Sequence, residues 1–253
     1  MHLAVYQENF YFNIAKFTWN LEKLDPDWKN AIKINHLFRQ MGISCLFWDD
    51  EIIHFCSYLN DDANSFLHFI TGLSPDTMVT SKFDAFFDAL VCKNYTLTEK
   101  ISTLHPTKVN HNYEYEEEFY YFHFLMSYFQ GYNEPGLNEI LLKWEKVLDG
   151  NTDIRYDICK SLIKKDVVLF EESFFPLLQK WEQVKQHEFA EELVSPEVAE
   201  TEGNISLEGI ALMRLVEKAG INITDQFSYM PQDVMDFTPR VYDDENWKKI
   251  ATV

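Results

Sequence analysis

Apolar residues recur every three or four positions through most of the chain, the spacing of one face of an α-helix. The clearest stretch is 137–148, which stops at Asp149 and Gly150, where a glycine can take the left-handed conformation that ends a helix. The spacing continues over 153–164 and again from Val167, where Pro176 is expected to bend or split the helix. The pattern predicts consecutive amphipathic helices joined by short turns.

Further helices are predicted on both sides of this region. Those of the N-terminal half span 29–41, 48–60, 61–71, 81–92 and 115–130, with stops at 42, 72–75 and 131–136. A C-terminal helix begins after Ser206 as N-cap and ends at Gly220. Glycine is scarce and hairpin signals are nearly absent, so the predicted fold class is all-α, with stacked antiparallel helical hairpins in a single compact domain.

The chain is predicted to form one domain over 1–253, because no long flexible linker divides it. A candidate sub-boundary lies at 131–136. The acidic segment 188–205 is a candidate mobile linker or solvated helix extension.

A short sequence motif occurs twice within the helical pattern. The runs 141–147 and 178–184 share a Trp-Glu-x-Val core, and 37 residues separate their tryptophans, a spacing near that of helix-turn-helix repeats. We expect four aromatic side chains of this region to be buried between adjacent helices: Trp144, Phe170, Phe174 and Trp181.

The chain is strongly acidic, with 41 Asp and Glu against 22 Lys and Arg, a formal net charge of −19. This excludes a general nucleic-acid binder, which needs clustered cationic surface. The 46% hydrophobic content excludes a disordered acidic tail. One reason to tolerate such self-repulsion is a cationic partner, toward which complementary fields accelerate association; the alternative is simple solubility.

Compartment and covalent chemistry are also constrained. The N-terminus lacks the cationic and apolar regions of a secretory signal, so a cytoplasmic location is expected. The most apolar window, 119–129, is too short for a membrane span, so no membrane association is predicted. The cysteines form no zinc-binding pair and are expected to be buried free thiols: Cys45, Cys56, Cys92 and Cys159.

No reaction is indicated by the motifs. His187 to Glu191 resembles the start of a zinc-protease helix, but Glu191 replaces the second histidine. No histidine stands beside a nucleophile in a recognisable motif, and no phosphate-binding glycine loop is present. The acidic runs, such as 49–51 and 61–62, are expected to be solvated faces or first turns of helices. We therefore predict no catalytic residue, no metal and no cofactor; an enzyme with a metal at His187 is the remote alternative.

The best candidate surface for a protein partner is the segment where tyrosines adjoin the densest acidic run. Tyrosine beside carboxylate suits a polar interface with aromatic anchors. The predicted contacts there are Tyr113, Glu114, Tyr115, Glu116, Glu117 and Glu118. Glu191 and Glu192 are the second candidate, and Glu116 and Glu117 are expected to be exposed.

The C-terminal half resembles a known family. The run 157–170, with a leucine before a charged turn and a phenylalanine-led helix after it, is similar to a segment of the Immunity protein 49 family of bacterial polymorphic-toxin systems. The run 206–221 and the Tyr229-Met230-Pro231 that follows are similar to the same family's C-terminal helix and its Tyr-x-Pro. A neighbouring group of helical immunity proteins against toxin nucleases ends in a similar Tyr-Pro element.

This resemblance implies an all-helical cytoplasmic antitoxin that binds and blocks a cognate toxin without catalysis of its own. Taken with the charge, it predicts a basic toxin partner, for example a nuclease or deaminase, whose active site is occluded. The alternative is a helical-repeat adaptor or scaffold that binds a cationic protein or peptide, as the repeated Trp-Glu-x-Val motif suggests. The oligomeric state is not predicted.

Overall fold

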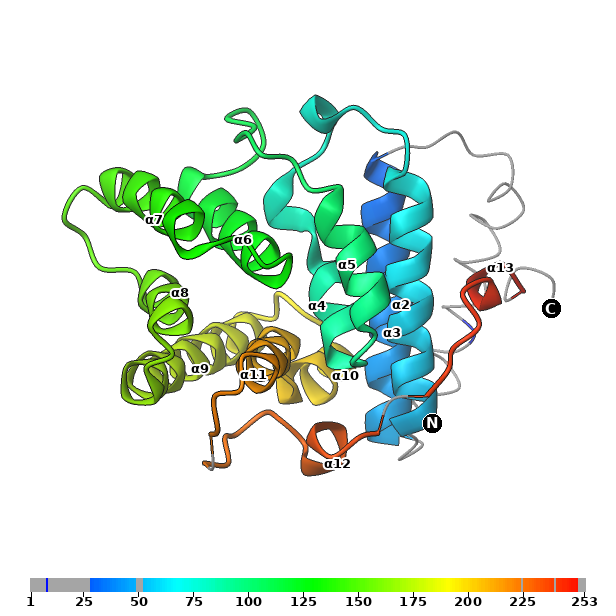
Figure 1. The fold of residues 1–253 in the computed structure, drawn as a ribbon. Helices are drawn as coiled ribbons and strands as arrows, with labels where there is room; N and C mark the ends of the chain where they lie inside the picture. The colour runs from blue at the N-terminus through cyan, green and yellow to red at the C-terminus, as the bar shows by residue number, and fades with distance from the viewer. Residues whose placement is uncertain (1–7, 9–27, 49–51, 224, 239, 250–253) are drawn as a thin grey trace.

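The computed structural model describes residues 8, 28–48, 52–223, 225–238 and 240–249. Every regular element among them is a helix, which confirms the predicted all-α class and single compact domain. Figure 1 shows the long helices α2 and α3 side by side on one flank, with α6 to α9 on the other. The predicted acidic run at 49–51 lies outside the described residues.

The helices α2 (Trp28–Trp48) and α3 (Ile52–Ile70) pack closely against each other. The predicted stop at Gly42 is wrong, because this glycine lies inside α2. A Cβ atom there would lie 3.0 Å from the Phe55 carbonyl oxygen and 3.2 Å from the Tyr58 Cβ. The glycine therefore permits the close approach of the two helices.

The middle of α3 is surrounded by protein, since α2, α4 (Asp84–Val91), α5 (Tyr95–Thr103) and α13 (Asn246–Lys249) all contact it. Residues 59–66 are consequently all buried, including Asp61 and Asp62. The prediction of a solvated acidic face here is wrong, as is the predicted break between two helices. The Asp62 Oδ2 accepts a hydrogen bond from Asn35 Nδ2 (2.8 Å), and Asp61 Oδ2 accepts one from Asn246 Nδ2 (2.7 Å).

Four consecutive helices form the other flank: α6 (Glu116–Phe129), α7 (Glu134–Leu148), α8 (Ile154–Lys164) and α9 (Val167–Ala190). Asn133, Asp153 and Asp166 are N-caps whose side chains accept hydrogen bonds from the first turns of α7, α8 and α9. Left-handed residues, Asp149 and Lys165, end α7 and α8. These local signals explain why the sequence pattern located these helices well.

Helix α9 runs through Pro176 without interruption, so the predicted split is wrong. The proline removes a hydrogen bond to the carbonyl of Glu172, four residues earlier. Glu172 is exposed and Pro176 half-exposed, so water can satisfy that carbonyl.

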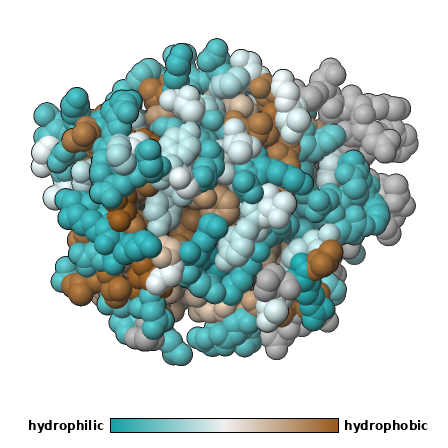
Figure 2. Space-filling view, viewed as in Figure 1, coloured by the Kyte–Doolittle hydropathy of each residue, from teal (hydrophilic) through white to brown (hydrophobic). Residues whose placement is uncertain are grey.

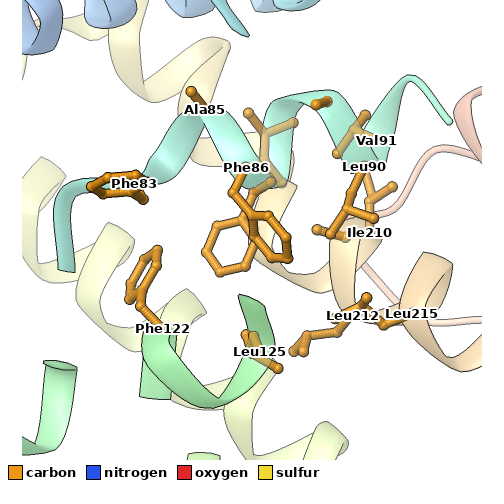
Figure 3. Close-up of a cluster of buried hydrophobic side chains, with 14 of the residues drawn as sticks. Phe83, Ala85, Phe86, Leu90, Val91, Phe122, Leu125, Ile210, Leu212 and Leu215 are labelled. Atoms are coloured by element: carbon orange, nitrogen blue, oxygen red, sulfur yellow. The ribbon is translucent and has the colours of Figure 1, made fainter. Parts of the chain in front are cut away.

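Helix α11 (Leu207–Lys218) packs against α4. Figure 3 shows Ile210, Leu212 and Leu215 of α11 in one cluster with Phe86 of α4 and Leu125 of α6. All five are fully buried. Helices distant in the chain are therefore joined through one hydrophobic core.

The expected burial of aromatic residues is confirmed for Trp144, Phe170 and Phe174, which are fully buried. It is wrong for Trp181, which is half-buried with its ring centroid 4.8 Å from that of Tyr229. The two Trp-Glu-x-Val runs therefore occupy different environments.

The segment after α9 is structured over part of its length. It contains α10 (Pro196–Glu200) and the 3-10 helix η3 (Glu202–Asn204), with Thr201 buried between them. The first residues of the predicted acidic segment, Glu188 to Ala190, belong to α9 itself. Two further 3-10 helices, η1 (Pro75–Thr77) and η2 (Thr80–Lys82), precede α4.

The C-terminal region folds back over the N-terminal helices (Figure 1). Arg214 is buried in α11 and donates to the carbonyls of Val234 (2.7 Å) and Met235 (3.0 Å), which fixes α12 (Gln232–Met235). Trp247 of α13 is buried beside Phe69 of α3. The four cysteines are buried thiols that form no disulfide, as predicted. None of the described helices combines the length and apolar character needed to cross a membrane.

Candidate functional site

The predicted tyrosine and glutamate segment lies at the start of α6. Tyr113 and Tyr115 are 74% and 76% exposed, which is unusual for large aromatic side chains. Glu116, Glu117 and Glu118 form the first turn of α6, where negative charge is favoured by the helix dipole. All three are partly buried, so Glu116 and Glu117 are less exposed than predicted.

Glu114 faces the protein interior. Its Oε2 accepts a hydrogen bond from the backbone N–H of Ser81 (2.8 Å), and its Oε1 accepts one from the N–H of Asn110 (3.0 Å). The residue is only 9% exposed. The prediction that Glu114 contacts a partner is therefore not supported, because both of its oxygens hold the loop before α6 against η2.

Glu191 and Glu192 lie directly after α9 and are exposed. They are near a groove between the end of α9 and α10 whose lining includes Phe189, Val198 and Tyr229. The two predicted acidic groups thus belong to different elements, the N-terminal end of α6 and the C-terminal end of α9.

A cleft of about 280 Å³ lies between these elements. Its lining comes from six α-helices, the 3-10 helices η2 and η3 and the chain segments beside them, and includes Arg39, Ser81, Lys82, Asp84, Phe87, Glu118, Phe122, Arg155, Trp181, Lys185, Glu202 and Glu208. Of the predicted contacts, only Glu118 belongs to this cleft. The same Lys185 also lines the groove beside α10, so the cleft and that groove are neighbours along α9.

Arg39 is held by carboxylates from α4. Its Nη2 and Nε lie 2.8 and 3.0 Å from Asp88 Oδ1, and its Nη1 lies 3.5 Å from Asp84 Oδ1. Burial lowers the pKa of the Arg39 guanidinium, but these carboxylates more than offset it, so the pKa is raised. Burial and the neighbouring Asp88 raise the pKa of Asp62, which lies behind this pair.

Arg155 is held in a comparable way. It makes a bidentate salt bridge with Glu208 of α11, in which Nε and Nη2 lie 3.0 and 3.1 Å from the two carboxylate oxygens. Its guanidinium also lies 4.7 Å from the ring centre of the buried Tyr121. Burial lowers the pKa of Arg155, but Glu208 raises it by more, so the pKa is raised overall. Both arginines therefore stay charged and are fixed in place.

Most of the cleft residues carried no signal in the sequence. Arg39, Arg155, Lys185 and Glu202 stand in four separate helices, and no spacing rule connects them. Apart from the predicted contact Glu118, the one residue with a sequence signal was Trp181 of the repeated Trp-Glu-x-Val run, which is half-buried and lines the cleft.

The histidines show one close pair. His105 Nε2 lies 2.7 Å from His123 Nδ1, and His105 Nδ1 donates to the Ser102 carbonyl. Burial and the nearby His105 lower the pKa of His123 to about 3, so the pair is neutral. His187 and Glu191 lie at the exposed end of α9, and no cluster of three metal-ligating side chains occurs in the part of the chain that the structure describes.

One face of the molecule is seen in Figure 2. It is mainly hydrophilic, with hydrophobic atoms gathered at the lower left, over α8 and the start of α9. Val168 and Phe175, both on α9, are exposed.

Comparison with models of known protein families gives a match. The family model described as Immunity protein 49 matches residues 48–234. This span includes α3 to α11 and all cleft residues except Arg39 and Ile43. No curated protein and no solved structure matches the chain.

Proposed function

The chain belongs to the Immunity protein 49 family, and from this membership we propose that it binds a cognate bacterial polymorphic toxin domain and neutralises it by occluding the toxin's active site. The family match over most of the chain is the observation that carries the proposal. We assign the binding to the cytoplasm. No reaction is assigned to the chain, in keeping with a family that is generally non-enzymatic.

The proposed partner is basic, for example a nuclease or deaminase with a cationic substrate groove. The net charge of −19 supports this, because opposite fields steer association and disfavour wrong partners. The proposed contacts are Tyr113, Tyr115, Glu116, Glu117 and Glu118, with Glu191 and Glu192 as the second group. Exposed tyrosines lose little conformational entropy when a partner orders them.

A helical-repeat adaptor remains the alternative function, with less support. The two Trp-Glu-x-Val runs that suggested it differ in structure, since Trp144 is fully buried and Trp181 is not. We therefore retain the immunity function as the conclusion.

The proposal is tested by complex formation with a toxin domain encoded beside this gene. The purified proteins are mixed and analysed by size-exclusion chromatography with light scattering, followed by an assay of the toxin's activity. We expect a stable complex in which the toxin is inactive. Separate elution with an active toxin would contradict the proposal.

A further inference from the structure

Two polar atoms in the wall of the central cleft have no hydrogen-bond partner among the described residues. Ser81 is 7% exposed, and its Oγ is buried without a donor or an acceptor. The Oε1 of Glu202 is likewise buried and unpartnered. Buried polar atoms in native proteins are nearly always satisfied, so the cleft offers hydrogen-bonding sites to a group from outside the chain.

The unmatched charge in the cleft is mainly negative. Its cations Arg39, Arg155 and Lys185 are already paired, with Asp88, Glu208 and Glu188 respectively. Glu118 and Glu202 make no ion pair within the described residues. Among the cations that line the cleft, Lys82 is the one that likewise makes no ion pair with a described residue. A donor-rich cation fits these two free carboxylates better than an anion would.

The walls also suit a flat cation. Trp181, Phe87 and Phe122 line the cleft, and an arginine guanidinium stacks favourably on aromatic faces. Its five N–H donors can serve a carboxylate and a hydroxyl together. The volume of about 280 Å³ is near the lower end of roughly 300–1,000 Å³ for small-molecule pockets, which suits a single side chain.

We propose that this cleft receives an arginine side chain of the toxin. The guanidinium donates to Glu202 Oε1 and Ser81 Oγ, lies against Trp181, and is attracted by Glu118. This assignment rests on the proposed function and specifies the chemistry of the contact. It adds a buried anchor to the more exposed acidic and tyrosine residues at the start of α6.

The chemistry is tested on the full chain without the toxin by an NMR titration with N-acetyl-arginine amide. We expect selective shifts of the Trp181 indole N–H and the Ser81 amide signals, and their loss in Glu202→Gln. The neutral isostere N-acetyl-citrulline amide should cause no such shifts, and Glu172→Gln, an exposed acid on α9, should behave as wild type. Shifts that are absent with the arginine probe, or equal with both probes, would overturn the proposal.

A second measurement uses the toxin domain encoded beside the gene. Glu202→Gln should weaken its affinity at least tenfold, while Glu172→Gln should change it less than twofold. If the toxin binds wild type and Glu202→Gln equally well, the cleft assignment fails and the proposed function stands. If the toxin does not bind wild type, the proposed function fails, and the titration alone decides whether the cleft binds arginine.

Discussion

At the scale of single residues, the main departure from the sequence pattern is the burial of charge. Adjacent aspartates normally indicate a solvent-exposed segment, but Asp61 and Asp62 are buried in the centre of α3. Their partners, Asn246 and Asn35, are distant in sequence, so only the tertiary fold brings them together. Sequence patterning has no means of detecting such pairs.

The buried Asp61 predicts a pH-dependent stability. Burial raises its pKa to about 7 from the ordinary 3.8, so the folded state favours the protonated form, and stability is lost as pH rises toward 7. Asp61→Asn removes this ionisable group. The change that it causes in the free energy of unfolding should therefore be more favourable at pH 8 than at pH 5 by about 2–3 kcal/mol. Urea unfolding at both pH values measures this. A stability difference that does not change with pH would contradict the role of ionisation.

His123 predicts a pH dependence of stability with the opposite sign. Its pKa is lowered to about 3, so the unfolded state takes up a proton below about pH 6.5 while the folded state does not. Stability contributed by neutral His123 is present above pH 6.5 and is lost as pH falls toward 3. His123→Asn, which keeps a donor toward His105, should flatten the pH dependence between 6 and 4 by about 1.4 kcal/mol per pH unit. Denaturant unfolding across this range is the check, and an unchanged slope would refute it.

At the scale of elements, the helices with local boundary signals were predicted well. Ser206 caps α11 and the 149–150 turn ends α7, as the sequence indicated, and the helix predicted from residue 153 begins directly after its N-cap Asp153. Two errors have different causes: Gly42 lies inside α2 because the close approach of α3 needs a glycine there, and Pro176 lies inside α9 where water can satisfy the carbonyl that the proline leaves free. Helix α5 was missed although Asn94 caps it, because its apolar face is short.

The two tryptophans of the repeated run should differ in their contribution to stability. Trp144 packs between Tyr121 and Tyr156 and is fully buried. Trp144→Ala should lower the free energy of unfolding by about 3–5 kcal/mol, and Trp181→Ala by clearly less. Chemical denaturation monitored by circular dichroism gives both values. Equal losses would show that the two sites are equivalent after all.

At the scale of the whole molecule, the candidate site was predicted only in part. The start of α6 was proposed from its tyrosines and glutamates, and of these residues Glu118 lines the central cleft. The rest of the cleft depends on how α2, α4, α8, α9 and α11 converge, which is set by long-range packing. Glu114 is an example of a predicted contact residue that the fold turns inward. Its hydrogen bonds from the backbone N–H groups of Ser81 and Asn110 depend on the tertiary structure, which the sequence pattern does not reveal.

The charge of the α6 end should govern association with the toxin. Glu116→Lys with Glu117→Lys should slow association and weaken its dependence on ionic strength, since rim charges act mainly on the association rate. The reversal also places positive charge at a helix N-terminus, which should cost about 0.3–1 kcal/mol of folding stability per residue. Stopped-flow kinetics at low and high salt measure the effect, and Glu171→Lys with Glu172→Lys on α9 is the charge-matched control. Unchanged kinetics at both salt concentrations would remove this surface from the interface.

The most direct test of the central claim is growth of bacteria that express the neighbouring toxin domain together with this chain. The account predicts that the wild-type chain restores growth and that the Glu116→Lys, Glu117→Lys variant, produced at the same level, protects less well. Continued growth arrest in cells with confirmed production of the folded wild-type chain would contradict the assignment of this chain as the antitoxin.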